Sequence, residues 1–417
     1  MALDTETTEP EAAAQHSASR DEIRDFLIQV GLLLHRHGTP SHRLERVLTQ
    51  LAQSLGVEGA FLYTPTSLLY SLRDREGETT YLRRVDSGQV DVDKLVQFDN
   101  VLQRLKSGEL TVAQTRQRLD AIAEAPPPFP EWTTALACAV SCAAVATLFR
   151  ATAGEVVAAS ALGLLVAGCE FLHRRFGWEH GFLEPVAGFA TALGALCWAR
   201  WVYPLDDRLV ALAGLIVMIP GLRITVALTE LAVGHLSAGV ARLAGGAVSL
   251  LTMTLGVGLA WRLAAHWRAL PPLPEWRGES HWQWVAAVVA PLAFAIFFRA
   301  RFPQWPIIVA VSVAGFAASR WTGSVWGVEG GAFCGALAVG FGSNLYARLR
   351  DRPAMVSQTP GIIVLVPGSL GYRSLTAFLD HETLAGLDFA WTMVMVAAAL
   401  VGGILTANVI LPPKSIL

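Results

Sequence analysis

The sequence predicts a multi-pass α-helical membrane protein of about ten spans, arranged as two inverted five-helix repeats with broken helices, plus an N-terminal cytosolic α+β domain. Three observations carry this prediction. Residues 1–130 hold 33 of the 66 charged residues of the 417-residue chain. The remaining residues form a series of long apolar segments. Two of these segments are interrupted by the same dipeptide, at Pro220-Gly221 and again at Pro367-Gly368.

Helical and β-strand patterns alternate in the N-terminal part, as in a small α+β domain. Apolar residues recur at helical spacing before and after a group of three β-prone runs. We assign residues 21–125 to a cytosolic α+β domain and residues 1–20 to a disordered lead-in, since these first residues are acidic and lack the apolar core of a signal peptide. The expected elements are helices 21–36, 44–55, 92–105 and 111–123 and strands 57–64, 67–72 and 80–85.

A stiff proline-rich linker, residues 126–132, separates this domain from the apolar segments. These segments form a first membrane repeat, 133–263, and a second, 282–417, joined by a polar linker, 264–281. An odd number of spans in each half gives the halves opposite orientations. A slight excess of basic residues in the loops on the side of the N-terminal domain places that domain in the cytoplasm. The expected segments are 133–149, 153–172, 182–201, 208–222, 240–263, 282–298, 304–319, 326–346, 355–370 and 386–411.

The two Pro-Gly interruptions indicate a transport site. Proline removes a helical N–H donor and glycine frees the backbone, so each segment stops or kinks there. Irregular backbone inside a bilayer is tolerated only where it is buried in protein or lines a wet cavity. Interrupted segments at matching places in two halves are typical of a transporter's binding site. We therefore expect Pro220, Gly221, Pro367 and Gly368 to contact the substrate.

Four polar residues near the interruptions are further candidates for substrate binding. Arg223 and Arg373 follow the two breaks, and a guanidinium group offers forked donors to a carboxylate. For Arg223, an interfacial anchor is the alternative. Thr225 and Asn344 suit a hydroxy amino acid, although a lone hydroxyl in a membrane helix more often bonds its own backbone.

Four acids are candidates for proton coupling. Glu230 and Asp380 each stand seven residues after the arginine that follows a break, and a carboxyl group buried there would exchange protons. The alternative, weighed equally, is that both acids lie at the membrane surface and cap a connecting helix. Glu184 and Glu329 match between the halves near the starts of equivalent spans, where complementing the helix dipole is the favoured structural explanation.

Four stretches, in the same order along the chain, carry a family resemblance. They are residues 37–45 (HGTPSHRLE), 90–95 (VDVDKL), 219–230 (IPGLRITVALTE) and 364–369 (VLVPGS). These stretches resemble those of the threonine/serine exporter (ThrE) family of bacterial inner-membrane proteins. Arg223 and Val226 stand where proline and asparagine are usual, and Glu230 replaces an aspartate. The resemblance implies a fused two-half exporter in the bacterial inner membrane, with its N-terminal domain in the cytoplasm.

The sequence therefore predicts a secondary transporter, not an enzyme, that exports small amino acids such as threonine and serine, driven by the proton gradient. Its partners are the amino acid, protons and membrane lipid. A homo-oligomer is left open, and no basic stripe indicates a nucleic acid. No catalytic residue, cofactor or metal is expected, and no phosphate-binding loop for ATP occurs.

Three alternatives remain open at this point. A dicarboxylate exporter of the same architecture would bind succinate-like anions, as has been associated with relatives whose halves are separate proteins. A membrane-anchored hydrolase or regulatory protein would use the His/Ser/Glu cluster at residues 35–45. A passive channel would use the same spans without coupling to protons.

Overall fold

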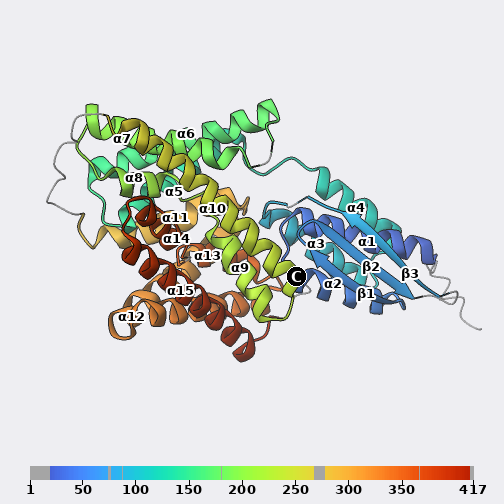
Figure 1. Ribbon diagram of the computed structural model, residues 1–417. Helices are drawn as coiled ribbons and strands as arrows, with labels where there is room; N and C mark the ends of the chain where they lie inside the picture. Colours follow the sequence, from blue (N-terminus) through green and yellow to red (C-terminus); the bar gives the residue numbers. More distant parts are fainter. Residues whose placement is uncertain are drawn as a thin grey trace, which may run out of the picture.

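The computed structural model describes residues 19–73, 77–86, 88–179, 181–266, 278–365 and 367–413 (Figure 1). The chain forms a small mixed unit followed by a larger bundle of helices. Figure 1 shows the mixed unit, in blue, at one end of the bundle. The expected lead-in, residues 1–20, and the expected linker, residues 264–281, lie largely outside the described residues.

The N-terminal unit, residues 20–124, packs four helices with a three-stranded antiparallel sheet of order β1-β2-β3. Helices α1 and α4 each begin with a capping box, Ser19 with Glu22 and Thr111 with Gln114, which satisfies backbone donors that a helix start leaves open. Tyr70 of β2 is fully buried in the shared core. The elements are α1 Arg20–Arg36, α2 Ser41–Ser54, β1 Glu58–Thr64, β2 Ser67–Arg73, β3 Glu78–Arg84, α3 Val92–Lys106 and α4 Val112–Glu124.

The helical bundle consists of two successive sets of helices. The first set is α5 Glu131–Leu148, α6 Ala153–Phe176, α7 Leu183–Trp201, α8 Asp207–Gly214, α9 Gly221–Ala232 and α10 Leu236–Ala264. The second set is α11 Trp282–Phe297, the short 3-10 helix η1 Phe302–Gln304, α12 Trp305–Arg350, α13 Met355–Ile363, α14 Gly368–Leu379 and α15 Thr383–Ile410. Helix α5 packs on α11, which joins the two sets.

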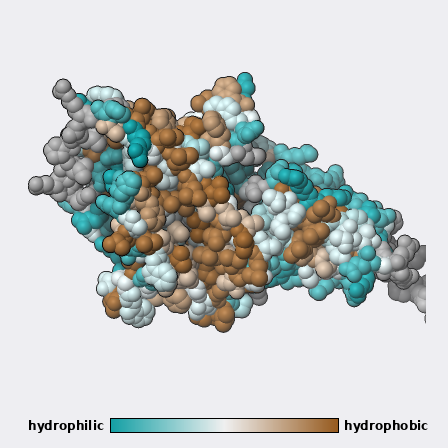
Figure 2. All heavy atoms as spheres, in the orientation of Figure 1, coloured by the Kyte–Doolittle hydropathy of each residue, from teal (hydrophilic) through white to brown (hydrophobic). Residues whose placement is uncertain are grey.

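Six stretches of the described residues contain helix long and apolar enough to cross a membrane, judged by length and composition. Apolar side chains cover much of the bundle's surface in Figure 2, whereas the N-terminal unit is mostly hydrophilic. On α10 the exposed apolar residues recur every three or four positions, which places them on one helix face. They are Val248, Leu251, Leu255, Leu259 and Leu263. The exposed apolar surface is that of a membrane protein.

The structure corrects the expected segments at two places. The expected segments 208–222 and 355–370 are each interrupted, because α8 ends at Gly214 and α13 at Ile363. Two short helices that the sequence analysis had not separated, α9 and α14, begin at the two glycines. The expected segments 304–319 and 326–346 correspond to the two arms of α12, which meet at a kink at Gly327, where φ is 77° and the backbone is not helical.

Ionic contacts attach the N-terminal unit to the bundle. Asp91, at the start of α3, accepts a hydrogen bond from Arg299 Nη1 at 3.0 Å, and Asp93 pairs with Arg301 at 2.7 Å. Between these pairs, Val92 N–H donates to the carbonyl of Phe298 at 3.0 Å. The carboxylates of Asp91 and Asp93 are buried, whereas their arginine partners are partly open to solvent; together these contacts hold the start of α3 against the bundle.

Candidate functional site

The two Pro-Gly breaks meet in space. Pro220 precedes the first turn of α9 and Pro367 precedes that of α14. A Cβ atom added to Gly368 would lie 2.6 Å from Ile219 Cγ2 and 3.0 Å from Gly221 Cα. The two helix starts therefore touch through backbone, which only glycine allows here. The first N–H groups of a helix have no partner within it. Here Gly221 N–H donates to the carbonyl of Ile219 at 2.8 Å and Leu370 N–H to that of Pro367 at 3.0 Å, so part of these donors is already used.

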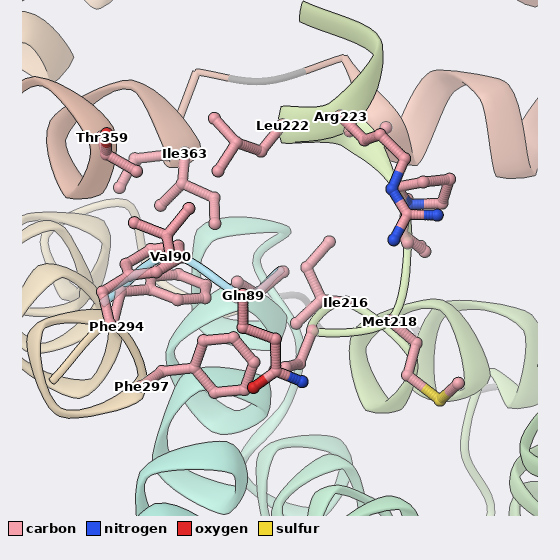
Figure 3. A pocket seen from close by; sticks show the side chains of 18 of the residues that line it. Gln89, Val90, Ile216, Met218, Leu222, Arg223, Phe294, Phe297, Thr359 and Ile363 are labelled. Atoms are coloured by element: carbon pink, nitrogen blue, oxygen red, sulfur yellow. The ribbon is translucent and has the colours of Figure 1, made fainter. Parts of the chain in front are cut away.

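A cavity of about 510 Å³ lies beside this meeting point (Figure 3). Its walls come from both sets of helices and from residues 88–90 of the N-terminal unit. The lining is mainly apolar and includes Phe294, Phe297, Phe298 and Phe316. A cavity of this size and character is typical of a small-molecule site, which ranges from roughly 300 to 1,000 Å³. The polar lining residues include Gln89, Glu170, Glu184, Arg223, Arg242, Ser249, Thr359 and Ser369.

Arg223 is exposed, and its side chain lines the cavity (Figure 3). It makes no hydrogen bond or ion pair with any residue that the structure describes. Its guanidinium donors are therefore available to an anion in the cavity. Arg373 differs, because its guanidinium lies 5.1 Å from the centre of the Phe149 ring and outside the cavity lining.

Glu230 of α9 is fully buried next to the N-terminal unit and forms an ion pair with Arg242 of α10. Its carboxylate accepts two hydrogen bonds from Arg242, from Nε at 2.9 Å and from Nη2 at 3.1 Å. It also accepts one from the N–H of Ser41 at the first turn of α2, at 3.0 Å. The helix start stabilises this negative charge. Asp380, in contrast, ends α14 and pairs with the exposed Arg208 at 2.6 Å.

Glu184 and Glu329 occupy comparable places in the two sets of helices. Glu184 is in the first turn of α7, lines the cavity and accepts a hydrogen bond from Ser249 Oγ at 3.2 Å. Glu329 follows the bend at Gly327 in α12 and is not among the cavity-lining residues. Of the four acids proposed for proton coupling, Glu184 is the one in the cavity lining.

The structure does not bring Thr225 and Asn344 to the cavity. Thr225 Oγ1 donates to the carbonyl of Gly221 at 3.1 Å, within its own helix. Asn344 is fully buried and its Nδ2 donates to Asn408 Oδ1 at 2.8 Å. Both side chains stabilise helix packing in this conformation. Pro367 is also absent from the lining, although Gly368 and Ser369 next to it are present.

A cluster of titratable groups lies where α2 meets the start of α10. Glu45 accepts a hydrogen bond from Tyr63 N–H at 2.9 Å and pairs with His235 Nδ1 at 3.2 Å. Burial raises the pKa of the Glu45 carboxyl above its usual value. Burial also lowers the pKa of His42 to about 3, since its buried Nδ1 has no hydrogen-bond partner among the described residues. No group of three or more metal-ligating side chains occurs in the described part of the chain.

Sequence reasoning missed two kinds of residue in this region. Arg242, the partner of Glu230, lies twelve residues later on the next helix, so a paired charge on neighbouring helices was a usable signal. Gln89 lies in a connection of the N-terminal unit, and no local pattern indicates that it reaches the bundle.

Two family models match the chain, one before and one after residues 267–277, which the structure does not describe. The model described as "Putative threonine/serine exporter" matches residues 25–264. The model described as "Threonine/Serine exporter, ThrE" matches residues 283–410. No solved structure matches the chain.

Proteins from fungi and from a bacterium are similar to this chain over most of its length. The chain is 24% identical over 380 residues to pheromone-regulated membrane protein 10 of Eremothecium gossypii, covering 86% of this chain and 50% of that protein. It is 23% identical over 434 residues to the protein of the same name in Saccharomyces cerevisiae, covering 95% and 55%. It is 26% identical over 330 residues to the probable threonine/serine exporter of Mycobacterium tuberculosis, covering 74% and 60%.

The chain spans about half the length of the curated relatives it matches. The family models nevertheless cover both the N-terminal unit and the two sets of helices, including both Pro-Gly breaks. By this match, the chain belongs to the threonine/serine exporter (ThrE) family.

Proposed function

We propose that this protein is a secondary transporter that exports small amino acids, with threonine and serine as the first candidates, across a bacterial cytoplasmic membrane. One observation carries the proposal. Two helix breaks from different halves of the chain meet beside a cavity that holds an arginine without an anionic partner among the described residues. Family membership supports the same conclusion, since one relative bears the name probable threonine/serine exporter.

The proposed topology has ten spans in two inverted repeats. The first repeat contains α5, α6, α7, the broken pair α8 and α9, and α10. The second contains α11, the two arms of α12, the broken pair α13 and α14, and α15. Five spans in each repeat give the two halves opposite orientations. The order of long and broken helices, which is the same in both halves, supports this assignment. The N-terminal unit then lies on the cytoplasmic side.

In the proposed mechanism, Arg223 and the free N–H groups at the starts of α9 and α14 bind the substrate carboxylate. Glu170 and Glu184 line the same cavity and favour a substrate that also carries an ammonium group. The amino acid crosses by alternating access, as the two halves move around the shared breaks. The cavity thus favours a zwitterion over a dicarboxylate, which would meet both acids as like charges.

Proton coupling is assigned first to Glu184, because it is the candidate acid that borders the cavity. Glu230 and Asp380 are ion-paired in this conformation, so a role in coupling requires these pairs to open elsewhere in the transport cycle. Glu329 holds the matching position at the bend of α12. We propose that protonation of Glu184 alternates with substrate binding.

Counterflow of labelled threonine in proteoliposomes tests the proposal. We expect threonine on both sides of the membrane to accelerate label uptake, and an imposed pH gradient to drive net flux. Glu184→Gln should retain counterflow and lose pH-driven flux. The matched control is Glu131→Gln, an exposed acid at the start of α5 outside the cavity lining, which should keep both activities.

Each component of the proposal has its own contrary result. Absence of threonine and serine flux would contradict the substrate assignment, and inhibition by succinate alone would favour the dicarboxylate alternative. pH-driven flux that persists in Glu184→Gln, Glu329→Gln, Glu230→Gln and Asp380→Asn would contradict the assignment of proton coupling to these acids, and absence of pH-driven flux in the parent would contradict proton coupling itself. Hydrolytic activity without flux would favour the hydrolase alternative.

A further inference from the structure

We propose that Gln89, from the N-terminal unit, contacts the transported amino acid and helps to determine specificity. This inference rests on the proposed transport function and extends it. The N-terminal unit would then be part of the binding site rather than an accessory to a membrane-embedded one.

The segment Gly88–Val90 reaches the cavity from outside the bundle. It connects β3 to α3, and all three residues line the cavity together with residues of the helix breaks. In Figure 3, Gln89 and Val90 are seen in the same cavity as Ile216, Leu222 and Phe297. The cavity wall is therefore built jointly by the N-terminal unit and both halves of the bundle.

Backbone contacts on both sides of Gln89 hold this segment in place. A Cβ atom at Gly88 would overlap the carbonyl oxygen of Arg36, so the segment packs directly against the end of α1. On the other side, Asp91 N–H donates to the carbonyl of His37 at 3.3 Å. One Asp91 oxygen caps α3 by accepting from Lys94 N–H at 3.0 Å, and the other accepts from Arg299. The position of Gln89 is thus fixed by its neighbours and not by its own side chain.

The Gln89 side chain has hydrogen-bonding capacity that the protein does not use. It is exposed to the cavity and forms no hydrogen bond with a residue that the structure describes. A carboxamide donates through its nitrogen and accepts through its oxygen. It therefore complements both ends of a zwitterion, a carboxylate as acceptor and an ammonium or hydroxyl group as donor. The surrounding lining is rich in phenylalanine, and the low local polarity strengthens such hydrogen bonds.

Kinetics of the full-length protein in proteoliposomes test this inference. Gln89→Glu keeps the size of the side chain but replaces its donor with a second acceptor, which would repel the substrate carboxylate. We expect the KM for threonine counterflow to rise about tenfold, with the maximal rate nearly unchanged. Gln89→Asn should restore part of the affinity, and the unfolding midpoint of each variant should match that of the parent, because the side chain bonds nothing in the protein.

The matched control is Gln53→Glu. Gln53 is exposed on α2 and does not line the cavity, so the same chemical change should leave KM and maximal rate as in the parent. An unchanged KM in Gln89→Glu, or an equal change in both variants, would overturn the inference. A lower maximal rate with an unchanged KM would also overturn it, since that result indicates a structural role.

A labelling experiment provides an independent readout. In a Cys138→Ala background, which removes the cysteine of the cavity lining, Gln89→Cys should react with N-ethylmaleimide and be protected by threonine. Gln53→Cys should react without protection. If the parent transports threonine and Gln89→Cys is unreactive or unprotected, the inference fails while the proposed function stands. If the parent transports no amino acid, the proposed function fails, and the inference with it.

Discussion

The two helix breaks have similar sequences but different surroundings. In the first, Arg223 faces the cavity and Glu230 is sealed inside an ion pair with Arg242. In the second, Arg373 stacks on Phe149 and Asp380 pairs with an exposed arginine. The N-terminal unit explains part of this contrast, because the N–H of its residue Ser41 donates to Glu230, whereas among the described residues Asp380 has no hydrogen bond to that unit. Sequence likeness between two halves therefore does not imply equal roles.

The two acids also lie at different positions relative to the ends of their helices. Both α9 and α14 contain 12 residues that start at the Pro-Gly glycine. Glu230 lies in the last turns of α9, whereas Asp380 lies one residue beyond α14. The acids match when counted from the arginines and not when counted from the breaks. The comparison thus teaches that the breaks, and not the charged residues, are the repeated feature.

The largest expected effect separates Glu230 from Asp380. Glu230→Gln leaves Arg242 without its counter-charge in a buried site, and we expect a loss of about 3 kcal/mol in stability. Asp380→Asn should cost less than about 1 kcal/mol, because Arg208 is 56% exposed and its pair is screened by solvent. Unfolding midpoints in one detergent would measure both, and equal shifts would contradict the comparison.

The second effect separates Arg223 from Arg373. Arg223→Gln should raise the KM for threonine by roughly 10-fold or more, since a hydrogen bond to a charged group contributes about 1.5 to 3 kcal/mol. Arg373→Gln should raise it much less, because that guanidinium is held on Phe149. Arg262→Gln, an exposed arginine near the end of α10 outside the cavity lining, serves as the control with parental kinetics. A larger effect at Arg373 would reverse the assignment.

The third effect tests the contact between the two breaks. Gly368→Ala forces a methyl group against Ile219 and Gly221, and overpacking of this kind costs about 1 to 3 kcal/mol. Gly245→Ala is the matched control, because a Cβ at Gly245 on α10 would meet no atom within 4 Å. That control should keep or slightly raise stability. Thermal unfolding of the two variants would sharpen the comparison, and a stable, active Gly368→Ala protein would argue against the close contact.

The smallest effect concerns the loss of stability at low pH. It arises at His42, in the N-terminal unit next to Ser41, which contacts Glu230 of the first break. The pKa of His42 falls to about 3 in the folded state, against about 6.5 in an unfolded chain. The unfolded state therefore binds more protons, and stability falls as pH drops from 6.5 towards 3. His42→Asn should reduce the loss between pH 6.5 and 5.5 by about 1 kcal/mol or less. Unfolding midpoints at the two pH values measure this, and an unchanged pH dependence would count against a buried, neutral His42.

Local patterns predicted the regular elements well. The expected helix 21–36 is confirmed as α1, Arg20–Arg36, and the expected segment 153–172 as part of α6. Helices α9 and α14 were missed because the expected segments ended at residues 222 and 370, so most of each short helix was left in the connection that followed. The division of α12 into two arms was expected from the two apolar segments, but the kink at Gly327, where the backbone is not helical, lies one residue inside the second expected segment.

Sequence analysis could predict only those residues of the candidate site that belong to the repeated Pro-Gly breaks. Gly221 and Gly368 were expected to border one site because matching interruptions in two halves meet at their interface. The roles of Thr225 and Asn344 depended on side-chain direction, which spacing along the sequence does not fix. The position of Gln89 at the cavity could not be predicted from the sequence for a related reason. Its position depends on contacts such as Asp91 with Arg299, 208 residues apart.

The bend at Gly327 has a consequence for engineering the protein. The two arms of α12 meet directly at Gly327, where the backbone is not helical, whereas α6 ends at Phe176 and α7 begins only at Leu183. An epitope or fluorescent tag inserted at the first corner would separate two helix arms that follow each other without a connecting loop, and one inserted at the second would extend an existing connection. Tolerance to added length should therefore be confined to one of two otherwise corresponding corners.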